Sequence, residues 1–162
     1  MAPLKVKCFM WRVCIGRIPT PQELAKRGVM IGDHLCRQCA NGIDEVDHNF
    51  AVCPFANEVL RKIWTWCNLN PPPDFNSIND IITYAANWGH CSKTRKILLA
   101  IIYGYVWCLW RMRNDRIFNN VCGSTTKVAD DVLSVVYEWV NYKGNFGNCN
   151  WVSWCCNPLN IV

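Results

Sequence analysis

The residues best suited to chemistry in this sequence are three cysteines and a histidine within residues 36–53. Cys36 and Cys39 have two residues between them, so a tight turn presents both thiolates to one ion. Zinc prefers a tetrahedral set of sulfur and nitrogen ligands, and four protein ligands leave no open position, which is typical of a structural site. The spacing therefore predicts one structural Zn²⁺ held by Cys36, Cys39, His48 and Cys53.

The alternative is four unrelated residues, because the chain has 12 cysteines and a chance Cys-x2-Cys pair is not unusual among them. Several others stand singly in apolar stretches, as small core residues do: Cys8, Cys14, Cys67 and Cys108. A disulfide framework needs an oxidising compartment, and lysines stand where a signal peptide needs an apolar run. We therefore expect a reducing, intracellular location, in the nucleus or the cytoplasm.

A second group of residues is cationic and opposes a single acid, Glu23. Its members are Lys5, Lys7, Arg12, Arg17, Lys26 and Arg27. Basic side chains release counterions from phosphates, and exposed aromatics such as Phe9 or Trp11 can stack on a base. We therefore expect residues 5–27, the basic segment, to contact RNA or DNA. The alternative is that both aromatics belong to the core and the cations form a solvated face.

The zinc loop, residues 36–53, and the residues just before it have the opposite charge. From Asp33 to Cys53 the acids are Asp33, Asp44, Glu45 and Asp47, against a single Arg37. Three thiolates on one Zn²⁺ add a further negative unit. We expect such a loop to repel phosphate, so the metal shapes the fold and the basic segment makes any contact with nucleic acid.

The elements that position these groups are expected to be helices. Thr20 to Glu23 has the pattern of a capping box with proline at the first helical position, and Gly28 is placed to end that helix. Further helices are predicted over residues 5–15, from Pro54 onward, from Ser77 or Asn76 to Trp88, from Ser92 to about Phe118, and over residues 126–142. The sequence shows little of the alternating apolar pattern that indicates β-strands. The predicted class is all-α, a small helical domain with a CCHC zinc loop between helices, followed by a helical C-terminal half.

The longest apolar stretch is Ile97–Trp110. It spans roughly 21 Å as a helix, short of the ~30 Å hydrocarbon core of a bilayer, so we expect a buried core helix and no membrane partner. Arg111, Arg113 and Arg116 follow, and they either extend the basic surface or cap this helix. The expected divisions are a zinc-binding region over 3–68, a Pro-rich linker over 69–75, a helical region over 76–143 and an irregular Trp/Cys-rich tail over 144–162.

Asp130 and Asp131 are the one pair that imitates a catalytic site, because paired aspartates hold metal ions in polymerases. That chemistry needs further carboxylates on a strand-turn-strand. The apolar residues around them recur at helical spacing instead, and no Gly-rich phosphate loop is present. We therefore expect neither an enzyme nor a small-molecule substrate.

The order of motifs resembles the zinc-binding region of plant LINE-type (non-LTR) retrotransposon reverse transcriptases. The matching stretches are residues 5–12, 16–20 and 24–28, Cys36-x2-Cys39, residues 44–48, residues 53–56 and Trp64. A later stretch, residues 107–118, resembles the segment that follows this region in the same polyproteins. The resemblance implies a zinc module C-terminal to a polymerase domain, with the same four ligands and a role in holding element RNA or target DNA.

No polymerase domain precedes Lys5 here, so we expect a fragment or a detached descendant of such an element. The expected function is a non-catalytic zinc-binding module with sequence-independent nucleic-acid binding. The alternative is a structural or protein-interaction module that meets a protein partner through exposed apolar surface, or a retroelement relic with no retained activity.

Overall fold

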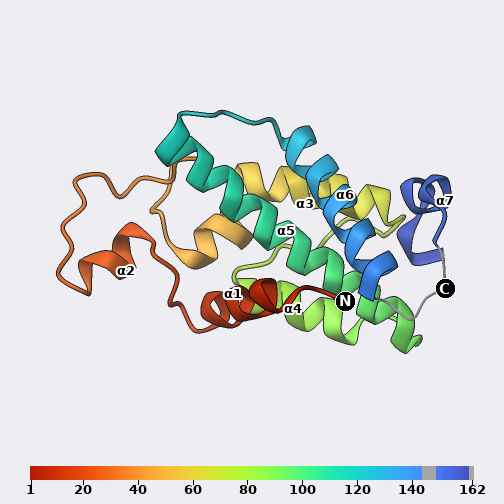
Figure 1. The fold of residues 1–162 in the computed structure, drawn as a ribbon. Coiled ribbons are helices and arrows are strands. Elements are labelled where there is room, and N and C mark those ends of the chain that lie inside the picture. The colour runs from red at the N-terminus through yellow and green to blue at the C-terminus, as the bar shows by residue number, and fades with distance from the viewer. Residues whose placement is uncertain (144–148, 161–162) are drawn as a thin grey trace.

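The structure, a computed structural model, describes residues 1–143 and 149–160 (Figure 1). Within these ranges every regular element is helical, and the only strand pairing is an isolated bridge between Leu35 and Ile43. The all-α class is therefore confirmed, with the zinc loop lying between helices. The remaining residues of the predicted C-terminal tail, 144–148 and 161–162, lie outside the described residues.

The helices follow the predicted order. They are α1 (Leu4–Cys14), α2 (Pro21–Ala25), the π-helical turn η1 (His48–Val52), α3 (Pro54–Trp66), α4 (Ile78–Asn87), α5 (Ser92–Asn119), α6 (Thr125–Lys143), α7 (Trp151–Cys156) and the 3-10 turn η2 (Pro158–Asn160). The long helices begin and end close to the predicted residues. This is expected where the capping residues stand at the ends of the helical pattern of apolar residues. The π turn and the two C-terminal elements had no clear sequence signal.

The predicted helix ends are formed by local hydrogen bonds. The Thr20 hydroxyl accepts from the Glu23 amide, and Ser77 and Asp80 cap α4 reciprocally. After α2 the amide of Val29 donates to the carbonyl of Leu24 at 3.0 Å, a bond characteristic of a Schellman motif. Gly28 there has a φ of +80°, a conformation that costs glycine little.

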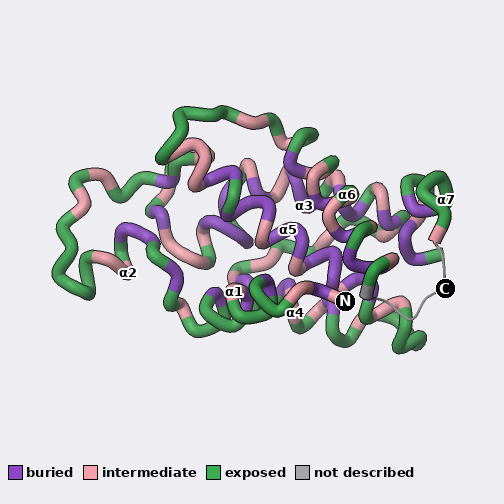
Figure 2. The backbone as a smooth tube through the Cα atoms, viewed as in Figure 1, coloured by how far each residue is buried: buried purple, intermediate pink, exposed green. Residues whose placement is uncertain are grey.

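Helix α5 is the central element of the fold, since α1, α3, α4 and α6 all contact it (Figure 1). Its apolar stretch is largely buried, which explains why it is apolar around nearly its whole circumference (Figure 2). No helix of the described residues is long and apolar enough to cross a membrane. The buried core includes residues from both sides of the triple proline at 71–73.

The short helix α7 owes its position to tertiary contacts. Trp154 is fully buried, and its indole N–H donates to the Leu133 carbonyl of α6 at 2.9 Å. The indole N–H of Trp66 on α3 donates to the carbonyl of Trp154 at 2.9 Å. Residues 151–160 are therefore ordered into helical turns where the sequence alone predicted an irregular tail.

Candidate metal centre

The four predicted ligands meet at one point of the fold. The sulfur and nitrogen atoms of Cys36, Cys39, His48 and Cys53 all lie within 4.8 Å of one another. Sγ of Cys36 is 3.9 Å from Sγ of Cys53, and Sγ of Cys39 is 3.3 Å from Nε2 of His48. Tetrahedral zinc with Zn–S bonds of about 2.3 Å sets its sulfur ligands about 3.8 Å apart. The donor types and their separations fit one zinc ion.

The turn that carries Cys36 and Cys39 directs backbone amides at both sulfurs. The amide of Gln38 lies 3.4 Å from Sγ of Cys36, and that of Asn41 lies 3.5 Å from Sγ of Cys39. The hydrogen bond from the Cys53 thiol, aided by the backbone amides of Cys39 and Gln38, lowers the pKa of Cys36 to about 5, while the same bond and burial raise the pKa of Cys53. Cys36 is therefore ready to bind metal as a thiolate.

Gly42 allows the His48 ring to approach this turn. Its carbonyl accepts from the Cys36 amide at 2.6 Å, beside the Leu35–Ile43 bridge. A Cβ atom at Gly42 would lie 2.1 Å from Cε1 of His48, which is far inside van der Waals contact. A side chain at this position would therefore displace the histidine from the cluster.

The π-helical turn brings the other two ligands together. The amide of Cys53 donates to the carbonyl of His48 at 2.8 Å, an i→i+5 bond that widens the turn between them. The Tyr105 hydroxyl of α5 donates to the Phe50 carbonyl at 2.8 Å and so satisfies a backbone group that this turn leaves free. Burial raises the pKa of Tyr105 well above its usual value, which keeps the hydroxyl a donor.

A buried ion pair joins the zinc loop to α5. Nε of Arg113 lies 3.0 Å from Oδ1 of Asp44, and Nη2 lies 2.6 Å from Oδ2. The two side chains are 7% and 1% exposed. Asn49 donates to the same carboxylate at 2.6 Å, and the guanidinium lies 4.6 Å from the Trp110 ring centre. This geometry is bidentate, with further partners for both charges, as a stable buried pair requires.

Arg116 makes a second link one helical turn further along α5. Its Nη1 donates to the carbonyls of Arg37 and Gln38 at 2.7 and 3.0 Å, and its guanidinium lies 5.8 Å from the Phe55 ring centre. Arg113 and Arg116 therefore hold the zinc loop instead of extending a basic surface, and Arg116 does so from the last turn of α5. Of the three arginines that follow the apolar stretch of α5, only Arg111 is exposed.

The sequence analysis missed the groups that support the ligands. They are Gly42, Tyr105, Arg113 and Arg116. The sequence did carry one signal, because an arginine at the end of an apolar, buried helix must find an acid on another element. The acid, Asp44, is 69 residues away in the chain, so spacing could not identify it.

The predicted nucleic-acid residues are not part of the metal cluster, and they lie on α1 and in the segments on either side of α2. All six are exposed: Lys5, Lys7, Arg12, Arg17, Lys26 and Arg27. Lys26 pairs with Glu23, and Lys5 lies over the ring of Trp107 at 5.7 Å. The segment thus presents its cations to solvent, in contrast to Arg113 and Arg116.

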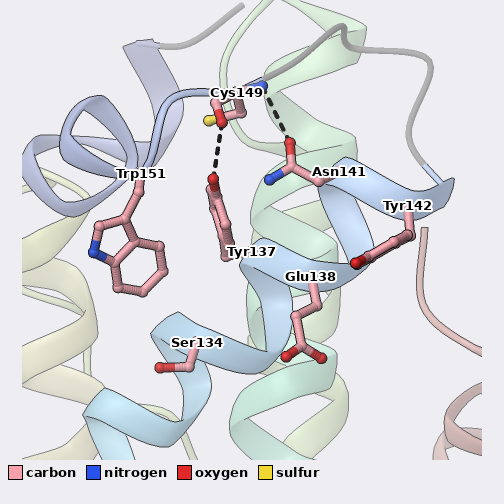
Figure 3. A pocket seen from close by; sticks show the side chains of 7 residues that line it. All are labelled: Ser134, Tyr137, Glu138, Asn141, Tyr142, Cys149 and Trp151. Atoms are coloured by element: carbon pink, nitrogen blue, oxygen red, sulfur yellow. Dashed lines mark hydrogen bonds between the residues drawn. The ribbon is translucent and has the colours of Figure 1, made fainter.

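Elsewhere in the described part of the chain, no other group of three His, Cys, Asp or Glu side chains converges on a point. Asp130 and Asp131 lie on α6, and Asp131 pairs with Lys127. A hollow of about 720 Å³ lies beside the C-terminal half of α6 (Figure 3). In it Tyr137 donates a hydrogen bond to the Cys149 carbonyl at 3.0 Å, and no metal-binding cluster is present among these described residues.

Residues 1–60 match a family model described as zinc-binding in reverse transcriptase. All four clustered ligands fall inside the matched range. Over these residues the chain is similar to the zinc-binding regions of reverse transcriptases, and its four-ligand site fits one zinc ion. No curated protein and no solved structure matches the chain.

Proposed function

We propose that this chain is a non-catalytic, zinc-stabilised module that binds RNA or DNA through backbone phosphates, without sequence preference. The observation that carries the proposal is the orientation of the basic segment. Its six cations are all exposed, and among the described residues the only carboxylate paired with one of them is that of Glu23. Such a face attracts the phosphates of a nucleic acid, and phosphate contacts do not depend on which bases are present.

The metal has a structural role in this proposal. Four protein ligands complete the tetrahedron, so no position is open for a substrate or an activated water. The zinc loop is tied to the core through Asp44, which leaves the basic segment to contact the ligand. We further propose an origin in a plant LINE-type retrotransposon and a reducing, nuclear or cytoplasmic location, on the motifs and the cysteine usage given above.

A salt series tests the proposal. Binding of a labelled single strand should weaken with a log–log slope near −0.7 per phosphate neutralised. Replacing Arg12, Arg17 and Arg27 by alanine should make that slope shallower by roughly 2 and weaken binding at low salt. Zinc content and helicity should not change, because all three side chains are exposed.

The matched control removes cations from another surface. Lys93 and Lys96 are exposed on the first turns of α5 and belong to another part of the sequence, and their alanine variants should keep the original slope. If the arginine variant and this control give the same slope, the basic segment is a solvated face and the proposal fails.

The second candidate is a protein-interaction module, favoured by apolar side chains near the zinc loop. Those more than two-fifths exposed include Val29, Met30, Leu35, Ile43, Val52 and Phe118, with Met30 at 89%. A monomer seldom exposes several large apolar groups close together. This candidate predicts salt-independent association with a protein and no response to the loss of Arg12, Arg17 and Arg27.

A further inference from the structure

Helix α1 has two faces, and each contains one of its two large aromatic side chains. Phe9 is half-buried, with its ring centre 5.4 Å from that of Trp107 and 5.7 Å from that of Trp110 on α5. Trp11 is 61% exposed and has no aromatic partner among the described residues. The two aromatics of this segment therefore have different roles, and only Trp11 is free to contact a ligand.

Trp11 lies near the middle of the exposed face. At about 100° per residue, Lys7 lies roughly 40° to one side of it around the helix and Arg12 roughly 100° to the other. Both cations are exposed. The buried residues Val6 and Val13 lie on the opposite side and fix this orientation. Because Val6 and Val13 are buried, α1 is fixed about its own axis, and the Trp11 ring points to solvent between two cations.

We infer that α1 selects single-stranded nucleic acid, by stacking an unpaired base on Trp11 while Lys7 and Arg12 contact the adjacent phosphates. The inference rests on the proposed function and adds that the bound nucleic acid is single-stranded. An aromatic ring between cations stacks on any base, because every base has a π face, so the site distinguishes unpaired from paired bases without reading sequence. In a duplex the base faces are covered by their neighbours, and only the phosphates are available.

The charge around Trp11 favours this occupant over an apolar protein segment. Glu23 is the only acid within residues 1–32, and it is paired with Lys26. Leu4 and Ile15 extend the exposed apolar side chains of α1 along the same face. A partner for this surface must therefore combine dense negative charge with flat apolar faces, as a single strand does.

Two probes of equal length and charge test the inference, a homopolymer DNA strand and an abasic strand that keeps the phosphates and sugars. Wild-type protein should bind the strand with bases roughly 5- to 150-fold more tightly than the abasic strand, the range expected for one stacked base. Trp11→Ala should remove most of that ratio and leave the salt slope unchanged. Trp11→Tyr should retain most of it.

The controls separate this inference from the proposed function. Trp151→Ala removes an exposed tryptophan on α7, at the other end of the molecule from α2, and should preserve the ratio (Figure 1). An unchanged ratio in Trp11→Ala, with a normal salt slope, overturns base stacking while phosphate binding stands. Absence of salt-dependent binding to either strand overturns both. If Trp11→Leu binds as well as Trp11→Tyr, the face is an apolar docking surface and the stacking inference is wrong.

Discussion

The zinc loop and the basic segment that precedes it have opposite formal charges, and they place those charges differently. The basic segment directs every one of its six cations to solvent. The loop buries Asp44 against Arg113, and the carboxylate of Asp47 accepts from the Ile78 amide at the start of α4. Of the loop's acids, Asp44 is therefore neutralised inside the molecule, and Asp47, although exposed, is hydrogen-bonded to another element. A count of charges along a sequence thus overstates how strongly this loop repels phosphate.

The largest expected effect comes from removing the metal. Cys39→Ser should abolish stoichiometric zinc binding and unfold the loop, because structural zinc contributes on the order of 10 kcal/mol to the folding of small modules. Metal analysis and circular dichroism measure both effects. Cys8→Ser is the control and should retain one zinc per chain, because Cys8 is exposed on α1 and not in the core as its apolar neighbours had predicted. Full zinc content in Cys39→Ser would rule out the four-ligand site.

The next effect concerns the buried ion pair. Arg113→Met leaves the Asp44 carboxylate buried without its partner and should cost about 3–5 kcal/mol of unfolding free energy. The double variant, with Asp44→Asn added, should recover part of that loss. Chemical denaturation measures the series.

The control for that series is the exposed pair between Arg61 and Glu58 on α3. Arg61→Met should cost less than about 1 kcal/mol, because exposed pairs contribute little. If Arg113→Met is no more damaging than Arg61→Met, the link between the zinc loop and α5 is not important for stability.

A smaller effect should follow from the close approach at Gly42. Gly42→Ala adds a methyl group against the His48 ring and should weaken zinc affinity by roughly tenfold or more, since misplaced ligands bind poorly. Competition with a chelator measures the change. Gly32→Ala, where an added Cβ meets no atom within 4 Å, is the control. Equal zinc affinity in the two variants would contradict this placement of the ring.

The smallest effect tests the charge of the loop directly. Reversing Asp44 would break a buried pair, so the clean variant is Glu45→Lys, whose side chain is only half-buried. It should tighten single-strand binding by a few-fold at low salt and leave stability within about 0.5 kcal/mol. Glu138→Lys, on the exposed face of α6, should change binding less. Equal changes in the two variants would place the loop away from the path of the nucleic acid.

The sequence by itself determined the helices from α1 to α6 and the four residues of the metal cluster. Caps such as Thr20 and Ser77 are local signals, and they set helix ends because their hydrogen bonds reach only a few residues. The four zinc ligands were predictable for the same reason, since they lie within one short stretch and zinc accepts few donor types.

Only the tertiary structure decided what surrounds those elements. The pairing of Arg113 with Asp44 joins residues 69 positions apart, and the exposure of Trp11 but not Phe9 depends on where α5 packs against α1. Both outcomes follow from burial, which depends on contacts between elements that are distant in the chain. Residue types and spacing do not specify those contacts, because the same arginine or aromatic suits a solvated face and a packed interface equally well.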